Sequence, residues 1–502
     1  MPNKKLEHDR LVRGIAKGAG VVLIGTFVGR LLGYLIRVFL ARYYGQEVYG
    51  FVSTSIAIFS TVTTIGLLGI PNSLARQISS YRIEEKWKKI SASVGVAYFV
   101  TGAIGIFFAI IIFIFSDSLA IQFFQDPQLT NYLLYFGIGI PFYLLLRISC
   151  NVFQGFQQMT AFITFRDVIR QLFILAGLIV MYFINFPVSH LGSAYFISFL
   201  LSSVLVFVTI WNISPIRNHG IHLDLSVAKE LFKFSWPLMF ASVLMRLMNQ
   251  TDTIMTGYFL DQAMVGIYNA GVPIGELLGV IYNSFTPALI PIMTDYYVSG
   301  QREKLQNSFN LSTKWIFLFV FPGFLLLLII PEFFIQVLFG TEYLAATNVL
   351  RLIALGVFFS SMVGPTGNLL IVIGKTKLVL IDFIIAYAVN IFLNIILIPK
   401  YGLIGAATAT ATSVVIHNTI TIFQIYYYLK LIAFRTVYLK ITLAGLIPGI
   451  LFWIIKDGLS GWILLVLCIA FTLVFVALNF LFGAISDEDK MIIREIKKRI
   501  TG

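Results

Sequence analysis

Two arginines lie seven residues apart in a segment that is otherwise apolar enough to cross a bilayer. They are Arg30 and Arg37 of RLLGYLIRVFLARYYG, residues 30–45. On a helix with about 100° between successive residues, the two side chains project within about 20° of each other. A guanidinium cannot be neutralised by deprotonation, and it costs about 2.5 to 3.5 kcal/mol at the bilayer centre. The two arginines therefore require a counter-charge, a ligand or a water-filled cavity.

A second polar face lies in the apolar segment MRLMNQTDTIMTG at 245–257. Helical spacing puts Arg246, Asn249, Gln250 and Thr253 on one face, with Asp252 on its flank. Because polar groups inside a membrane turn away from lipid, we expect this face to line the interior of a helix bundle.

Other ionisable side chains occur in the remaining apolar segments. Arg147 is a further cationic candidate, whereas Arg170 is near the end of its segment and either faces the interior or extends to the membrane surface. The carboxylates are Glu276, which has Asn283 seven residues later on the same helix face, and Asp382.

This excess of arginine favours an anionic ligand, because guanidinium binds phosphate through paired hydrogen bonds. We predict that a diphosphate is bound by Arg30, Arg37, Arg147 and Arg246, in a cavity whose polar lining includes Asn249, Gln250 and Asn283. The alternative is that the arginines pair with carboxylates inside the bundle. Asp252, Glu276 and Asp382 are then counter-charges, or they couple transport to protons or sodium ions.

The amino-acid composition predicts that these residues lie in membrane-spanning helices. Of 502 residues, 58% are hydrophobic and only 12% are charged, whereas soluble domains have about 25% charged residues. The apolar runs are continuous, which excludes a transmembrane barrel and predicts an all-α polytopic membrane protein. Fourteen spans are expected, at 14–42, 48–72, 89–115, 129–153, 161–185, 188–214, 229–256, 263–295, 309–338, 346–373, 375–399, 402–429, 436–456 and 460–482.

An internal repeat organises the spans. A shift of 216 residues places four residues of the first half on identical residues of the second: Arg30 on Arg246, Gln46 on Gln262, Gly50 on Gly266 and Pro71 on Pro287. Each half has six spans, so the repeat is parallel, and two six-helix lobes related by a pseudo-twofold axis are expected to enclose a cavity and to rock between inward-open and outward-open forms. The predicted parts are an N-lobe at 1–214, a cytoplasmic linker at 215–228, a C-lobe at 229–429, two extra helices at 430–483 and a basic cytoplasmic tail at 484–502.

The charge distribution predicts the orientation. The net charge is +13, and the basic residues are concentrated in alternate loops, such as RIEEKWKK at 82–89. The positive-inside rule explains this distribution, so nucleic acid is not an expected partner. Both termini are expected in the cytoplasm of a cell-membrane protein. No cleavable signal peptide is recognised. No metal or other cofactor is expected, because Cys150 and Cys468 are far apart and the five histidines lack ligand spacing.

Several segments resemble the polysaccharide-synthesis branch of the multidrug/oligosaccharidyl-lipid/polysaccharide (MOP) exporter superfamily. They include ARYYGQEVYGFVS at 41–53, LLGIPNSLARQIS at 67–79, FSWPLMFASVLMRLMNQTDTIMTGYF at 234–259 and NIFLNIILIPKYGLIGAATATATS at 390–413. The resemblance implies a flippase, not an enzyme, that moves an undecaprenyl- or dolichyl-diphosphate-linked glycan to the outer leaflet. Arg30 and Arg37 match the cationic first helix of such flippases, and Arg246 matches the basic position of their seventh.

The expected partners are that lipid-linked glycan, membrane lipids and glycan-assembly proteins. Three rival functions remain. The first is a lipid II flippase, which also has fourteen spans. The second is a multidrug and toxin exporter, which transports organic cations by means of carboxylates in its cavity. The third is a membrane glycosyltransferase or glycan polymerase, which would place acidic or histidine residues on a large outer loop.

Overall fold

Every element of the structure is helical. The computed structural model describes residues 2–213, 220, 222–431, 436–459, 461–485 and 489. Their contacts divide the chain into two compact units, residues 1–266 and 267–502. The prediction of an all-α membrane protein is confirmed.

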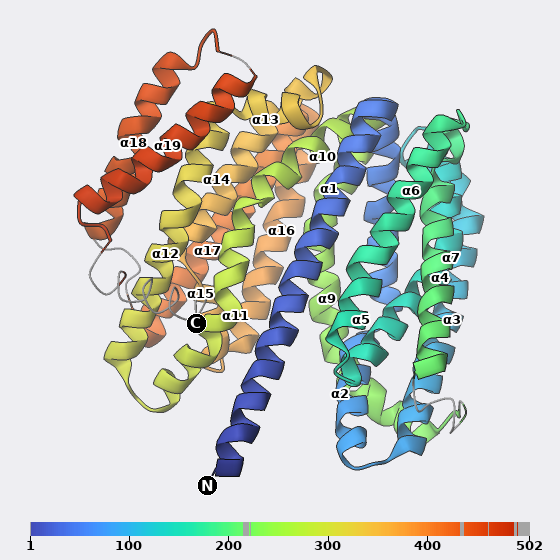
Figure 1. Ribbon diagram of the computed structural model, residues 1–502. Helices are drawn as coiled ribbons and strands as arrows, with labels where there is room; N and C mark the ends of the chain where they lie inside the picture. Colours follow the sequence, from blue (N-terminus) through green and yellow to red (C-terminus); the bar gives the residue numbers. More distant parts are fainter. Residues whose placement is uncertain are drawn as a thin grey trace. The chain divides into compact units, whose positions relative to one another are not determined.

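The first unit is built from long helices that pack lengthwise. Its helices are α1 (Pro2–Gly66), α2 (Ile70–Ile83), α3 (Trp87–Asp117), α4 (Leu129–Gly155), α5 (Met159–Ile163), α6 (Arg170–Phe183), α7 (Gly192–Ile213), α9 (Leu225–Phe259) and the start of α10 (Gln262–Glu276). Shorter π-helical segments, η1 (Ser118–Phe123) and η2 (Thr164–Ile169), extend α3 and join α5 to α6, and a 3₁₀ turn, η3 (Val188–His190), precedes α7. Within this unit α4 packs against α3 and α7 (Figure 1).

The second unit has the same construction. It contains the rest of α10 and α11 (Leu278–Val298), α12 (Arg302–Ile329), α13 (Pro331–Leu338), the 3₁₀ segment η4 (Thr341–Ala346), α14 (Thr347–Val363), α15 (Thr366–Val372), α16 (Thr376–Tyr401), α17 (Leu403–Leu429), α18 (Thr436–Ile455) and α19 (Trp462–Leu481). The last two helices lie side by side in Figure 1, and α18 packs against α12.

Helix length and hydropathy identify the candidate membrane spans. Ten helices in the described part of the chain are long and apolar enough to cross a membrane, or eleven if the bent pair α10 and α11 counts as one span. One of the ten, Ile24–Gly66, has 43 residues, about 65 Å of helix against a hydrocarbon core of about 30 Å. It turns at Gly45, whose φ of 85° lies in the left-handed region that glycine tolerates. The count of fourteen stays a prediction.

The boundary between the compact units differs from the predicted lobe boundary. The sequence predicts a linker at 215–228, whereas α9 begins at Leu225, where the side chain of Asp224 accepts hydrogen bonds from the backbone of Ser226 and Val227. Most of residues 214–221 lies outside the described part of the chain. Because α9 packs against α1, α2 and α3, its contacts join it to the first unit. Most of the predicted tail at 484–502 is also outside the described residues.

The repeat-related residues meet in a reciprocal contact inside the first unit. A Cβ added to Gly50 would collide with the carbonyl oxygen of Gln262, and one added to Gly266 would collide with that of Gln46. A shift of 216 residues relates Gln46 to Gln262 and Gly50 to Gly266. When residue i contacts j′ and residue j contacts i′, the two segments are arranged as around a local twofold axis. This contact supports the repeat that was predicted from four residue matches.

Candidate functional site

The glycines of α1 fix the orientation of its arginines. A Cβ at Gly25 would strike Ile163, one at Gly29 would strike Asp167, and one at Gly33 would lie 3.5 Å from the Gln171 side chain. The three glycines are four residues apart, and so are the three residues that they contact, as expected for two parallel helices in close packing. The glycine ridge therefore packs against α5, η2 and α6, and the adjacent face that carries Arg30 and Arg37 is left exposed.

Three further arginines of the first unit converge on one tyrosine. Arg147 of α4, Arg170 of α6 and Arg246 of α9 all act electrostatically on Tyr143. The guanidinium carbon of Arg170 lies 5.9 Å from the centre of the Tyr143 ring. Arg170 thus lies near the same tyrosine as Arg147 and Arg246.

Arg37 is connected to the same region through a second tyrosine. Arg37 and Arg170 both act electrostatically on Tyr195, which lies on α7. The guanidinium carbon of Arg37 is also 5.9 Å from the ring centre of Tyr34. We call Arg37, Arg147, Arg170 and Arg246 the arginine cluster.

Stacked aromatic rings hold the two tyrosines in place. Phe59 stacks on Phe199 at 4.9 Å between ring centres and meets Tyr143 edge-on at 5.1 Å. Phe136 lies 4.9 Å from Tyr195 and 5.5 Å from Phe59. Offset and edge-on pairs are the favoured arrangements of aromatic rings. Helices α1, α4 and α7 therefore supply a rigid support for the arginine cluster.

The structure argues against the alternative that carboxylates neutralise these arginines. Arg166 pairs with Asp167 through contacts of 2.9 and 2.6 Å, but the ion pairs seen among the described residues include none with Arg30, Arg37, Arg147, Arg170 or Arg246. The Nε of Arg147 is buried and has no hydrogen-bond partner in the described structure. A buried donor in this state is available to an acceptor on a ligand.

The predicted polar residues fall in both units. In the first, Asn249 is exposed, Gln250 is half-buried and Asp252 is buried on α9. In the second, Asn283 and Glu276 are exposed. The prediction that Glu276 and Asn283 share one helix face is wrong, because α10 ends at Glu276 and the chain bends by 43° before α11 continues.

The remaining carboxylate, Asp382, is part of a buried polar group between α16 and α17. Its Oδ1 accepts a hydrogen bond of 2.8 Å from Gln424 Nε2, and its Oδ2 is buried without a hydrogen-bond partner among the described residues. His417 interacts with Asp382 electrostatically and stacks on Phe383 at 4.7 Å. Sequence spacing pointed to Asp382 but not to His417, because nothing in the sequence pairs the two helices.

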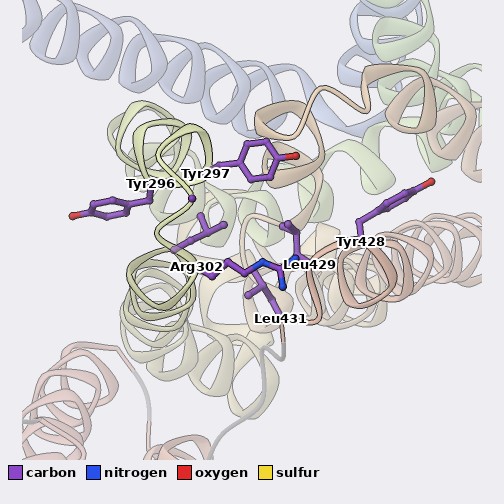
Figure 2. Close-up of a pocket in the computed structure, with 8 residues that line it drawn as sticks. Tyr296, Tyr297, Arg302, Tyr428, Leu429 and Leu431 are labelled. Atoms are coloured by element: carbon purple, nitrogen blue, oxygen red, sulfur yellow. The ribbon is translucent and has the colours of Figure 1, made fainter.

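A pocket of about 180 Å³ in the second unit contains none of the predicted site residues. Figure 2 shows its one arginine, Arg302, extending beside Leu429 and Leu431, with the rings of Tyr296 and Tyr428 at the sides. A pocket with one cation and several leucine side chains offers too little positive charge for a diphosphate. The arginine cluster is therefore the stronger candidate site.

Known proteins are similar to this chain in sequence or in fold. The membrane protein MJ1068 of Methanocaldococcus jannaschii is 23% identical over 469 residues, 89% of this chain and 91% of that protein. The lipopolysaccharide biosynthesis protein WzxC of Escherichia coli is 22% identical over 416 residues, 79% of this chain and 75% of that protein. The structure of the lipid II flippase MurJ in an inward closed conformation matches with a TM-score of 0.75 at 19% identity, over 92% of this chain and 98% of that one.

Two family models match the sequence. The MatE model covers residues 237–396. The model described as polysaccharide biosynthesis protein covers residues 15–297, which is more than half of the 502 residues. The chain therefore belongs to the polysaccharide biosynthesis protein family of the MOP exporter superfamily.

Proposed function

We propose that the protein is a flippase that moves a glycan linked to a lipid diphosphate from the inner to the outer leaflet by alternating access. The observation that carries this proposal is the arginine cluster, whose four guanidinium groups have no carboxylate partner in the described structure. A diphosphate supplies the missing negative charge and accepts paired hydrogen bonds from guanidinium groups. The glycan and its polyprenyl or dolichyl carrier are the proposed partners, together with membrane lipids and glycan-assembly proteins.

The family and the named relatives support this substrate class. WzxC is a lipopolysaccharide biosynthesis protein, and MurJ is a lipid II flippase. Lipid II transport is a second candidate, favoured by the structural match to MurJ over 98% of that chain. Both candidate substrates carry a diphosphate, so the arginine cluster serves either. An organic cation would be repelled by four unpaired guanidinium groups.

Binding by purified variants tests the proposal. Arg170→Ala and Arg246→Ala each remove a guanidinium that acts on Tyr143. We expect each to weaken lipid-diphosphate binding by about ten- to a hundredfold, since a charge-assisted hydrogen bond contributes about 1.5 to 3 kcal/mol. Arg30→Ala is expected to cause a loss of similar size. The Arg170 and Arg246 losses should be less than additive in a double-mutant cycle, because both contact one ligand.

Lysine variants and a surface control complete this experiment. Lysine keeps the charge but lacks the planar fork, so Arg246→Lys should give an intermediate loss. Arg351→Ala is the matched control, because Arg351 is an exposed arginine of the second unit that pairs with Glu332 at 2.9 Å. Unchanged affinity in all cluster variants, or equal affinity for a lipophilic organic cation, would contradict the proposal.

We also propose that transport is coupled to protons or sodium ions, with Asp252, Glu276 or Asp382 as the coupling residue. Asp382 is favoured, since one of its buried carboxylate oxygens has no partner in the described structure. Asp382→Asn is expected to remove the dependence of transport on the ion gradient in proteoliposomes, while Glu276→Gln serves as the exposed comparison. If the dependence survives neutralisation of all three carboxylates, they are structural counter-charges.

The orientation belongs to the same proposal. Basic residues of alternate loops favour a cytoplasmic location for both termini in a cell-membrane protein.

A further inference from the structure

One face of α2 carries a group of polar residues that have no part in the proposed function. Ser73, Arg76, Gln77 and Ser80 follow one another at intervals of three, one and three residues. This spacing places them on a single side of a helix, one turn above another. On α9, Lys233 and Phe234 follow Glu230 at the same spacing.

A glycine brings the two helices close together. Gly69 precedes α2 with φ at 71°, and a Cβ there would collide with the backbone of Ser235 on α9. Because the helices approach at this point, their two polar faces border one pocket of about 310 Å³. It is lined by Ser73, Arg76, Gln77, Ser80, Tyr81, Glu230, Lys233 and Phe234. We call it the α2–α9 pocket; all of it lies in the first unit.

The α2–α9 pocket has more hydrogen-bond donors than its own groups satisfy. Gln77 is only 8% exposed, and its Oε1 accepts a bond of 3.1 Å from Ser93, but its Nε2 has no partner in the described structure. Arg76 and Lys233 form no ion pair with any described residue. The guanidinium carbon of Arg76 lies over the Phe234 ring, 4.1 Å from its centre.

The one carboxylate of the pocket is already engaged. Tyr81 donates a hydrogen bond of 2.7 Å to Glu230 Oε2. Burial and this hydrogen bond raise the pKa of Tyr81, so the phenol remains a donor at neutral pH. The pocket therefore has two cations, one buried amide donor and the Ser80 hydroxyl, and its single carboxylate already accepts a hydrogen bond. The second unit's pocket, in contrast, has one arginine among leucines and tyrosines.

We propose that the α2–α9 pocket binds a phosphate group. Arg76 and Lys233 supply positive charge, and the Gln77 amide and the Ser80 hydroxyl supply neutral donors, a combination that suits a phosphate oxyanion. Two sources have this chemistry, the headgroup of an anionic phospholipid and soluble phosphate. The proposal does not depend on glycan transport, since binding alone tests it.

The test uses the purified full-length chain and two probes. Native mass spectrometry measures how much phosphatidylglycerol is retained relative to phosphatidylcholine, and equilibrium dialysis with radiolabelled inorganic phosphate measures the soluble ligand. The variant Arg76→Gln/Lys233→Gln is expected to lose about tenfold or more in affinity for the probe that binds. Lys229→Gln is the matched control, because Lys229 is an exposed lysine one turn away on α9 and does not line the pocket.

A variant with the opposite effect separates binding from misfolding. Glu230→Gln removes the negative charge of the pocket, so we expect tighter phosphate binding, which an unfolded protein would not give. Loss of phosphatidylglycerol in the double variant assigns the site to a lipid headgroup, and loss of dialysable phosphate assigns it to the soluble ion. The proposal fails if neither probe distinguishes the double variant from Lys229→Gln, or if Glu230→Gln weakens binding.

Discussion

At the scale of single residues, a largely buried ion pair joins α12 to Asp489, which follows α19. The Nζ of Lys314 contacts Asp489 Oδ2, and the Nε1 of Trp315 donates a bond of 2.9 Å to Oδ1 of the same carboxylate. The side chains are 11% and 2% exposed for Lys314 and Asp489. Removing one partner of such a pair leaves an uncompensated buried charge.

Asp489→Ala is therefore expected to destabilise the protein by about 3 to 5 kcal/mol, measured as a lower temperature of unfolding in detergent. The matched control is Asp457→Ala, which breaks an ion pair with Lys456 in which Asp457 is 84% exposed, and it should cost less than about 1 kcal/mol. The double variant Lys314→Met/Asp489→Leu should recover most of the loss, since it leaves no buried charge. A small effect of Asp489→Ala would contradict a structural role for this pair.

The residue scale also shows which parts of the site the sequence could predict. Cationic residues inside apolar spans are conspicuous, and Arg37, Arg147 and Arg246 were found for that reason. Tyr143 and Tyr195 were missed, because a tyrosine in a membrane span is ordinary until a neighbouring helix is known. Such a contact depends on tertiary packing, which local spacing does not encode.

At the scale of the elements, close approach of helices depends on glycines at two places. In α1, Gly25, Gly29 and Gly33 recur every fourth residue, a spacing typical of close helix packing, and they contact α5, η2 and α6. The close contacts of Gly50 on α1 and Gly266 on α10 were not anticipated, although the two residues match each other in the repeat. Spacing within one helix predicts a packing face, but it does not identify the partner helix.

Gly50→Ala and Gly266→Ala should each destabilise the protein by about 3 kcal/mol, because the new Cβ would overlap a backbone carbonyl that has no side-chain freedom to move. Gly102→Ala is the control, since the nearest atom to its Cβ would lie 3.9 Å away and alanine favours a helix. Thermal unfolding of the purified variants measures all three. Equal stability of Gly50→Ala and Gly102→Ala would show that α1 and α10 are not in close contact.

Two elements could not be predicted because their causes are not local. The bend of 43° after Glu276 interrupts a segment whose apolar residues are continuous. The π-helical segment η2 interrupts the helix between α5 and α6, whereas the sequence predicted a regular span at 161–185. Composition specifies that a segment is helical and apolar, but tertiary contacts decide where it bends.

At the scale of the whole molecule, composition determined the fold class and charge distribution predicted the orientation. Labelling of introduced cysteines tests that orientation, after the native Cys150 and Cys468 are replaced by serine. Lys88 lies in the first turn of α3, within the basic segment that follows α2, and Asp457 lies between α18 and α19; both positions are exposed and are replaced by cysteine in turn. Because basic loops remain in the cytoplasm, an impermeant maleimide added to intact cells should label residue 457 and should reach residue 88 only after permeabilisation. Labelling of residue 88 in intact cells would show that the topology is the reverse of the predicted one, with the α2–α9 pocket on the outer side of the membrane.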